Sequence, residues 1–224
     1  ERAAVEFEGV EKAYGDVRAL DGLDFTVHET RFFVLFGPSA VGKTTTLRTI
    51  AGLVRPDRGR VRADIRLPSA EEVSETCDAR PQAAEKEYRY FLYLSPVASP
   101  FLSRYSWHVE GATDLDAVRE ALSRVVGEHD FTSFRGQGCT ARSSVRTVFR
   151  AGVSRHDVPG LWSIDLAGSG FLRHMVRNIV GTVVEAGKGK YPAGLVEEIL
   201  LARDRSAAGI TAPARGLFLW RVSY

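Results

Sequence analysis

Residues 171–181, FLRHMVRNIVG, lie at the centre of the pattern that decides the fold. They open a predicted helix that runs over residues 171–186 and ends at Gly187. Upstream of it, residues 145–153 and 162–167 alternate between apolar and polar side chains, as a pair of strands does. Two strands followed by a helix indicate an α+β arrangement.

The same pattern extends outward in both directions. Residues 88–94 are aromatic and β-rich, and their alternation predicts a half-buried strand with four side chains on one face: Tyr88, Tyr90, Leu92 and Leu94. Residues 113–116 offer a helix cap, and apolar residues then recur on one helical face from Leu115 until Gly127. A third helix is predicted over residues 192–202, and a closing strand over residues 217–222. The fold class predicted for this part is α+β, an antiparallel or mixed sheet with packed helices.

Residues 1–62 predict a different architecture of two short strands, a loop and a helix. A β-rich run at residues 31–36 leads into a glycine-bounded loop at 37–42 and then into helical spacing at 43–53. Residues 55–61 are polar and rich in arginine, and no element is predicted there. This order predicts a partial α/β fragment, so the chain is divided into domains 1–62 and 63–224, with the boundary near residues 62–66.

The composition is that of an ordinary globular protein. Among 224 residues, 30 Lys and Arg stand against 28 Asp and Glu, 44% are apolar and two are cysteines. These values exclude the collagen-like, disordered and disulfide-scaffold classes, and no apolar run approaches the ~18–20 residues that a membrane span needs. The first six residues form neither a basic nor an apolar leader, so we expect no membrane insertion and a cytoplasmic location.

Positive charge is concentrated in one part of the chain. Residues 131–190 contain nine basic residues and three acidic ones, a local excess of six positive charges. Such a block suits a surface that follows nucleic-acid phosphates, because neutralising phosphates releases counterions. It equally suits a solvated face without a ligand, and charge alone leaves both interpretations open.

The N-terminal part contains a phosphate-binding motif. Residues 37–44, GPSAVGKT, fit the spacing G-x-x-x-x-G-K-[ST] between a predicted strand and a predicted helix. In that context the loop amides and the helix N-terminus cradle phosphates, Lys43 reaches the β and γ oxygens, and Thr44 holds Mg²⁺. Together with residues 5–15, 19–23 and 45–53, this segment resembles the opening of an ABC transporter ATPase.

That resemblance implies Mg-ATP as a ligand. Tyr14 would stack on adenine, and the implied nucleotide-binding set is Tyr14, Gly37, Ser39, Gly42, Lys43, Thr44 and Thr45. An ordinary turn tyrosine is an equal alternative for Tyr14. No LSGGQ-type signature, second acidic strand or switch histidine follows residue 62, so hydrolysis is not expected and the loop would at most bind nucleotide weakly.

The second resemblance covers residues 63–224. Residues 79–90, residues 127–135 (GEHDFTSFR), residues 171–181 and residues 216–219 (GLFL) occur in an order similar to the C-terminal part of the bacterial tRNA pseudouridine synthase A family. The resemblance implies an isomerase that converts uridine to pseudouridine in the anticodon stem-loop of tRNA. It also implies a homodimer and no metal or organic cofactor.

Breaking and remaking the glycosidic bond requires a nucleophilic carboxylate, a cation beside it and a stacking surface for the flipped base. By resemblance, Tyr88 packs on the base, and Arg177 pairs with the catalytic aspartate and keeps it ionised. A core strand tyrosine and a surface arginine are the alternatives. The residues assigned to RNA binding are Arg80, Arg135, Arg142, Arg146 and Arg173.

The aspartate itself is not identified. In the family it lies in a Gly-Arg-Thr-Asp element of the N-terminal half, and this chain contains no such tetrapeptide. Asp64 and Asp78 are the nearest carboxylates in sequence, and neither is assigned as the nucleophile because both lie too close to Tyr88. Cys77 and Pro81 also replace phenylalanines that are usual in the family.

Three functions follow from these observations. The first is a tRNA pseudouridine synthase-like protein whose activity is impaired because the Asp motif is absent, with the ATPase-like segment as a fused or rearranged leader. The second is a catalytically inactive tRNA-binding remnant. The third is an ATP-binding fragment of an ABC transporter ATPase, which Mg-ATP binding abolished by Lys43→Ala would reveal.

Overall fold

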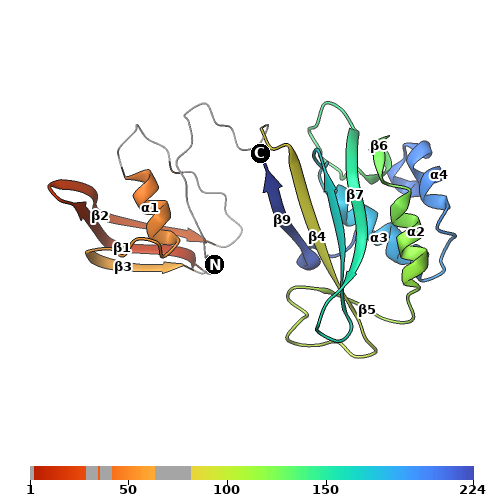
Figure 1. Ribbon diagram of the computed structural model, residues 1–224, viewed down its shortest axis with the longest axis horizontal. Coiled ribbons are helices and arrows are strands. Elements are labelled where there is room, and N and C mark those ends of the chain that lie inside the picture. Colours follow the sequence, from red (N-terminus) through yellow and green to blue (C-terminus); the bar gives the residue numbers. More distant parts are fainter. Residues whose placement is uncertain (1–2, 29–34, 36–41, 64–81) are drawn as a thin grey trace. The chain divides into compact units, whose positions relative to one another are not determined.

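The computed structural model describes residues 3–28, 35, 42–63 and 82–224. The chain divides into two compact units, Glu1–Cys77 and Asp78–Tyr224, and each is described by itself (Figure 1). The boundary predicted near residues 62–66 lies partly outside the described residues.

The first unit is a three-stranded antiparallel sheet with one helix. The strands are β1 (Ala3–Tyr14), β2 (Val17–His28) and β3 (Arg58–Ala63), in the order β2-β1-β3. Val5, Phe7, Val10 and Leu20 form a small buried core. Ile50 of the helix α1 (Lys43–Ile50) and partly buried apolar side chains of all three strands pack against it. The predicted strand at residues 31–36 lies outside the described residues except for Leu35.

The structure corrects two expectations for this unit. Residues 55–61, for which no element was predicted, include the first four residues of β3. Val61 and Ala63 pack on the core, whereas Arg58, Arg60 and Arg62 are exposed. The β1 glutamates stand opposite these arginines in register, which places Arg62 3.6 Å from Glu6. The helix predicted to reach residue 53 ends at Ile50.

The second unit is built on a six-stranded mixed sheet in the order β5-β4-β8-β7-β6, with β9 paired to β4. The pairs are antiparallel except for the parallel pair of β4 and β5. The strands are β4 (Glu85–Leu94), β5 (Trp107–Val109), β6 (Gly127–Asp130), β7 (Val145–Arg155), β8 (Leu161–Gly168) and β9 (Leu217–Ser223). This mixed sheet confirms the predicted α+β class.

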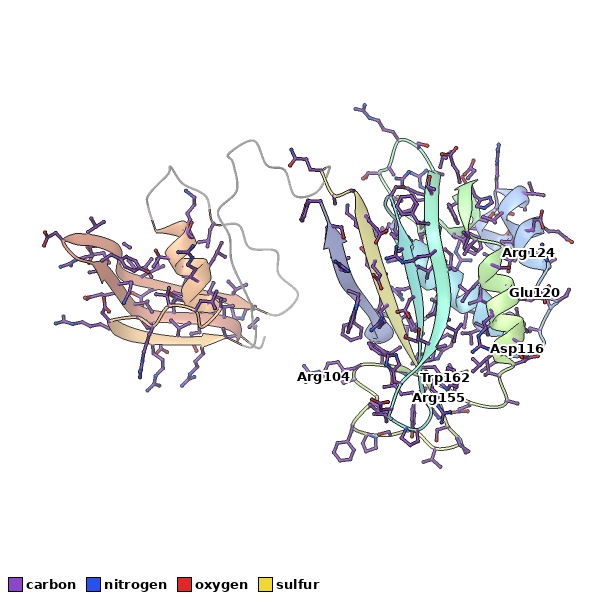
Figure 2. All side chains as sticks on the ribbon, viewed as in Figure 1. Arg104, Asp116, Glu120, Arg124, Arg155 and Trp162 are labelled. Carbon is purple, nitrogen blue, oxygen red and sulfur yellow. The ribbon has the colours of Figure 1, made fainter. Side chains whose placement is uncertain are left out.

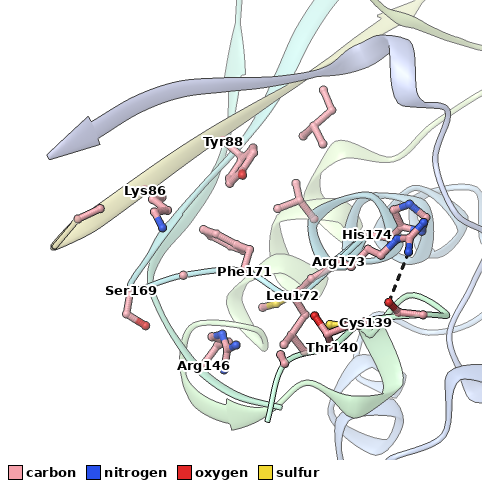
Figure 3. Close-up of a pocket in the computed structure, with 17 residues that line it drawn as sticks. Lys86, Tyr88, Cys139, Thr140, Arg146, Ser169, Phe171, Leu172, Arg173 and His174 are labelled. Carbon is pink, nitrogen blue, oxygen red and sulfur yellow. Dashed lines mark hydrogen bonds between the residues drawn. The ribbon is translucent and has the colours of Figure 1, made fainter. Parts of the chain in front are cut away.

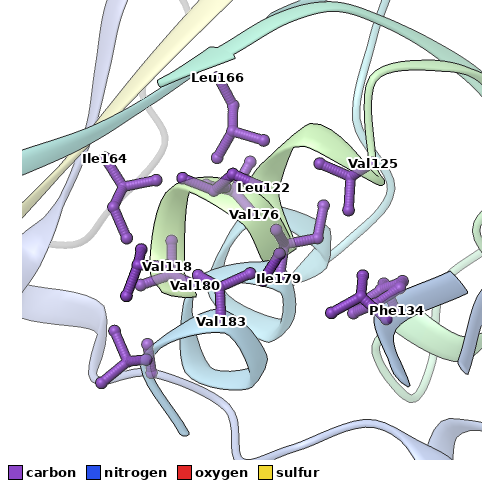
Figure 4. Packing of buried hydrophobic residues seen from close by; sticks show 14 of the residues in the cluster. Val118, Leu122, Val125, Phe134, Ile164, Leu166, Val176, Ile179, Val180 and Val183 are labelled. Atoms are coloured by element: carbon purple, nitrogen blue, oxygen red, sulfur yellow. The ribbon is translucent and has the colours of Figure 1, made fainter. Parts of the chain in front are cut away.

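Helices cover one face of this sheet (Figure 1). They are α2 (Leu115–Ser123), α3 (Met175–Gly187) and α4 (Leu195–Ala202), with short 3₁₀ turns at Thr132–Phe134, Arg205–Ala207 and Ala214–Gly216. Figure 4 shows Ile164 and Leu166 of β8 packed toward Leu122 of α2 and Val180 of α3. The predicted single-face pattern of β4 is confirmed, since Tyr90 and Leu92 are fully buried in this core. Among the described residues, no helix has the length and apolar character to span a membrane.

The helix predicted from residue 171 begins four residues later, at Met175. His174 adopts a left-handed backbone with φ of 61°, which interrupts helical geometry at that point. Gly136 packs against this turn, and its N–H donates to the carbonyl of Arg173 at 2.7 Å. A Cβ at Gly136 would lie 2.8 Å from the His174 ring, so this contact requires glycine. The third helix also begins later than predicted: α4 starts at Leu195, whereas the prediction placed its start at Pro192.

The predicted cap of α2 is confirmed, and it gives a measurable stability effect. An Asp114 carboxylate oxygen accepts hydrogen bonds from the backbone N–H groups of Asp116 (2.8 Å) and Ala117 (3.2 Å). We expect Asp114→Ala to lower the free energy of unfolding by about 1 kcal/mol, because two helix N–H groups lose their acceptor.

Tryptophan fluorescence during urea unfolding measures this loss in the second unit, since Trp107, Trp162 and Trp220 are the chain's three tryptophans and all lie there. The matched control is Asp157→Ala in the exposed turn between β7 and β8, which should leave the transition unchanged. Equal stability of the two variants would refute a capping role for Asp114.

Candidate nucleic-acid interface

The second unit contains a cavity of about 910 Å³ where β4, β9 and the segment before α3 meet (Figure 3). Three cations line it, Lys86, Arg146 and Arg173, together with the imidazole of His174. None of the described lining residues is an aspartate or a glutamate. The described part of the lining therefore attracts anions and contains no carboxylate.

Aromatic rings form one wall of this cavity. Tyr88 stands edge to face with Phe171, with ring centroids 5.2 Å apart and an interplanar angle of 82°. Tyr88 shares its sheet face with buried Tyr90 and Leu92, but it lies nearer the start of β4, where its ring is only partly buried and lines the cavity. Leu217 at the start of β9 completes the apolar side. Such a wall suits the flat face of a nucleobase.

Arg135 holds the opposite wall in place. Its guanidinium donates to the backbone carbonyls of Cys139 and Ala141, the latter at 3.0 Å, and to the Ser144 hydroxyl at 3.3 Å. These bonds fold residues 136–144 into the loop whose Gly138, Cys139, Thr140 and Ala141 line the cavity. Arg135 thus stabilises the loop that forms this wall of the cavity.

The thiol in this wall is chemically distinctive. The pKa of Cys139 is lowered by hydrogen bonds from the backbone N–H groups of Ala141 and Arg173 and by the nearby Arg135 guanidinium. Because the thiolate is the form that reacts, alkylation of Cys139 should reach half its maximal rate at a lower pH than alkylation of free cysteine.

Iodoacetamide labelling across a pH series, followed by peptide mass spectrometry, measures this rate. Bound tRNA should slow the labelling because Cys139 lines the cavity. Cys139→Ser supplies the control without an adduct at that position. A pH profile equal to that of free cysteine would contradict the lowered pKa.

Arg177 lies on α3 beside the cavity, not among its lining residues. Its Nε donates to the carbonyl of Ala212 at 2.6 Å, and the N–H of Ala212 donates back to the carbonyl of Arg177 at 3.1 Å. Arg177 and Arg173 act together on His174, whose pKa is lowered by partial desolvation and then by these two cations. The guanidinium is therefore oriented by main-chain contacts.

A network around Arg205 fixes the segment that holds Arg177. Arg205 donates to the carbonyls of Ala208 (3.2 Å) and Gly209 (2.9 Å) and to Oδ1 of the buried Asn178 (3.2 Å). Thr211 also donates to Oδ1 of Asn178, at 2.6 Å. These bonds tie residues 208–212 to α3, so the Ala212 carbonyl has a defined position.

The residues expected to bind RNA occupy different places. Arg146 and Arg173 line the cavity, Arg135 braces its wall, and Arg142 is exposed without lining it. Arg80 lies outside the described residues, as do Asp64 and Asp78. The sequence reasoning missed Phe171, Cys139 and Leu217, although Phe171 and Leu217 belong to stretches that carried the family resemblance.

The nucleotide-binding residues expected in the first unit are described in part. Gly42, with φ of 83°, precedes α1, and Lys43, Thr44 and Thr45 form its first turn. A Cβ at Gly42 would lie 2.1 Å from the carbonyl oxygen of Ala19, so the start of α1 packs directly on β2. Tyr14 is about half exposed at the end of β1. Gly37 and Ser39 lie outside the described residues.

Comparison with known proteins places both resemblances on the chain. A family model described as tRNA pseudouridine synthase matches residues 121–224, and one described as ABC transporter matches residues 20–130. The tRNA pseudouridine synthase A of Syntrophotalea carbinolica is 46% identical over 162 residues, which cover 72% of this chain and 64% of that protein. The Geotalea uraniireducens protein of the same name is 42% identical over 161 residues, covering 72% and 65%.

A third relative is covered more fully. The tRNA pseudouridine synthase A of Acetivibrio thermocellus is 36% identical over 200 residues, which cover 84% of this chain and 79% of that protein. The chain thus spans about two thirds of the length of the first two relatives and more of this one.

Proposed function

Because the chain belongs to the tRNA pseudouridine synthase A family, we propose that its second unit binds the anticodon stem-loop of tRNA and accepts a flipped uridine in the cavity for isomerisation to pseudouridine. One observation carries this proposal: an aromatic wall of Tyr88 and Phe171 faces the cations Lys86, Arg146 and Arg173 in a single cavity. Bases that leave a stack are held by aromatic rings, and phosphates by cations.

The residues divide into three roles. Tyr88 packs on the uracil ring and limits its rotation. Arg146 and Arg173 contact phosphates on either side of the flipped nucleotide. Arg177, oriented by the Ala212 carbonyl, pairs with the nucleophilic carboxylate and keeps it ionised, because an adjacent cation lowers a carboxyl pKa. The reaction needs no metal or organic cofactor in this scheme.

The carboxylate is the missing part of this centre. The described cavity lining contains no acidic residue, and the chain contains no Gly-Arg-Thr-Asp element. We therefore expect the isolated chain to bind tRNA and to form product slowly or not at all. Slow product formation would identify an impaired synthase, whereas tRNA binding without any product would identify the second candidate, a tRNA-binding remnant without chemistry.

Tritium release from tRNA transcripts labelled at carbon 5 of uridine tests the chemistry, because that hydrogen leaves only if the base is isomerised. Release by the purified chain, abolished by Tyr88→Ala, would support a working centre. No release together with retained tRNA binding favours the remnant. Loss of both binding and release would refute the proposed function.

Salt dependence tests the phosphate contacts. We expect Arg146→Ala to weaken tRNA binding and to reduce the slope of log K against log salt by about 0.7 to 0.9, the value for one lost phosphate contact. Fluorescence anisotropy with labelled tRNA from about 50 to about 200 mM salt measures the slope.

The matched control is Arg124→Ala at the residue that follows α2, where Arg124 lies near Glu120 and Glu197 and is not part of the cavity lining (Figure 2). The control should leave the slope unchanged. Equal slopes for both variants and the unchanged chain would place the phosphate contacts elsewhere.

Three further parts of the proposal concern the whole chain. We propose that it acts as a homodimer in the cytoplasm. Light scattering on the purified protein tests whether it forms a dimer. We also propose that the first unit binds Mg-ATP weakly through Lys43, Thr44 and Tyr14. Binding of Mg-ATP that Lys43→Ala abolishes would favour the third candidate function, an ABC-type nucleotide-binding unit.

A further inference from the structure

A cluster of aromatic rings lies on the face of the sheet opposite the helices. Side chains along a strand alternate between faces, so Tyr90 of β4 is buried beneath the helices whereas Phe91 projects on the other side. The ring centroid of Phe91 lies 5.5 Å from that of Phe218 and 6.3 Å from that of Trp220, both on β9. The ring of Tyr105, between β4 and β5, lies 6.5 Å from that of Phe218. Phe91, Tyr105, Phe218 and Trp220 form the outer aromatic cluster.

Two rings of the outer aromatic cluster are open to solvent. Trp220 is 51% exposed and Tyr105 is 53% exposed, whereas Phe91 and Phe218 are partly buried. The described helices of this unit lie on the other face of the sheet (Figure 1). The inner rings thus support the outer ones, and the outer ones present flat apolar surfaces on which a further planar group can pack.

A cation holds Trp220 in a defined orientation. The Arg89 guanidinium lies 4.0 Å from the centre of the indole, and its Nε donates to Asp165. Asp165 also accepts hydrogen bonds from Ser154 and Ser163, each at 3.1 Å. Because these bonds position Arg89, the indole rests with one side on a guanidinium, and its half exposure leaves the other side open.

A second guanidinium adjoins the cluster at Tyr105. Nε of Arg215 donates to the carbonyl of Ser106, the residue after Tyr105, at 3.2 Å. Arginines therefore lie at both exposed rings, Arg89 beneath Trp220 and Arg215 next to Tyr105. Aromatic rings interleaved with cations are the pattern that binds unpaired nucleotides, because bases stack on the rings while phosphates contact the cations.

The neighbours of the cluster on this face favour a nucleic acid over a protein partner. Across the sheet, β7 and β8 place Gly152 opposite Asp165 and Ser154 opposite Ser163. The exposed leucine of β9, Leu219, stands opposite Tyr88 in register and so lies on the other face. A protein interface needs a contiguous apolar centre, which these polar neighbours interrupt, whereas bases carry polar edges of their own.

We propose that the outer aromatic cluster is a second RNA-binding surface, which stacks unpaired bases of a single-stranded RNA segment on Trp220 and Tyr105 while Arg215 contacts the phosphate backbone. None of the four rings is among the residues that line the cavity described above. The surface is therefore separate from the site of the proposed isomerisation, and the inference does not depend on that reaction.

The probe is a fluorescent single-stranded oligoadenylate about ten nucleotides long, which stacks well and contains no uridine to isomerise. Fluorescence anisotropy with the full 224-residue chain measures its affinity. We expect Trp220→Ala to weaken binding about tenfold, the equivalent of ~1.4 kcal/mol, because one base loses its stacking partner. The matched control is Phe149→Ala, a ring of β7 that is 47% exposed and outside the cluster, and it should leave the affinity unchanged.

Two further variants and a duplex probe sharpen the assignment. Tyr105→Ala, in the segment between β4 and β5, should also weaken binding. Arg215→Ala should reduce the slope of log K against log salt by about 0.7, the value for one phosphate contact on a single strand. The same oligonucleotide paired with its complement should bind less tightly, since paired bases cannot stack on the rings. Urea unfolding verifies that each variant folds, and Trp107 and Trp162 report it in the Trp220 variant.

A cavity variant separates the two RNA sites. Arg146→Ala should leave oligoadenylate binding unchanged, and its effect on tRNA tests the proposed function alone. Loss of oligoadenylate binding in Arg146→Ala would place the probe in the cavity and overturn the inference. Equal affinities of Trp220→Ala, Tyr105→Ala and the unchanged chain, or no binding by the unchanged chain, would also overturn it. So would a dimer that Trp220→Ala converts to a monomer in light scattering, because the cluster would then be an interface between copies.

Discussion

Gly181→Ala is expected to lower the free energy of unfolding of the second unit by about 3 kcal/mol or more, the upper end of the overpacking range. A Cβ at this position would lie 1.8 Å from the carbonyl oxygen of Ile210 and 2.8 Å from its carbon. The two backbones cannot simply separate. Ala212 and Arg177 exchange hydrogen bonds at one end of this contact, and the N–H of Ile210 donates to Glu185 at 3.2 Å.

The sign of the change in unfolding free energy distinguishes a steric conflict at Gly181 from an effect of helix propensity. In an unobstructed helix interior, replacing Gly with Ala stabilises by roughly 0.5–1 kcal/mol, because alanine has the higher helix propensity. The steric conflict at Gly181 must therefore exceed that gain. The matched control is Gly194→Ala before α4, where the new Cβ meets nothing within 4 Å and φ is −62°.

Urea unfolding followed by tryptophan fluorescence compares the two variants. The control should be neutral or slightly stabilising. The Gly181 variant should unfold at much lower urea. A stabilised Gly181→Ala protein would show that α3 and residues 210–212 do not pack as described.

Asn178→Ala is expected to cost about 3 kcal/mol, because it removes the centre of a buried polar network. Asn178 is fully buried, and its Nδ2 donates to the carbonyl of Phe134 at 2.8 Å. Its Oδ1 accepts from Arg205 and Thr211. Alanine would remove the donor to the Phe134 carbonyl and the shared acceptor of Arg205 and Thr211. Nη2 of Arg205 and the Thr211 hydroxyl would keep only their mutual hydrogen bond of 3.0 Å. Each unsatisfied buried group costs ~1–3 kcal/mol.

Two comparison variants identify the cause. Gln137→Ala removes an exposed amide next to Gly138 and should leave stability unchanged. Asn178→Asp keeps the acceptors for Arg205 and Thr211 but loses the donor to Phe134, so its cost should fall between those of the other two variants. An equal cost for Asn178→Ala and Gln137→Ala would contradict the network.

The elements predicted correctly have signals in their own residues. The aromatic alternation of β4 and the Asp114 cap of α2 depend on neighbours within a few positions, and both are present in the structure. The start of α3 depends instead on Gly136, 38 positions before His174, whose close packing accompanies the left-handed turn. No periodicity in the helix sequence contains that information.

The site divides in the same way. Tyr88 was assigned from motif resemblance, and the structure places it in the cavity beside Arg146 and Arg173. Cys139 and Leu217 reach the same cavity from positions far apart in the chain, so only the folded arrangement brings them together. The bracing role of Arg135 was equally hidden, because its acceptors are backbone carbonyls, which every residue has.

Arg177 owes its orientation to the peptide carbonyl of Ala212, and this has a consequence for how the protein can change over generations. A substitution can remove an acceptor that belongs to a side chain. The acceptor at position 212 is a backbone oxygen, which every residue at that position has. Position 212 can therefore drift among small residues while the guanidinium keeps its acceptor. Gly181 is the constrained position instead, because a side chain there would lie 1.8 Å from the Ile210 carbonyl oxygen and 3.2 Å from the Ala212 nitrogen, and would displace the segment that carries the acceptor.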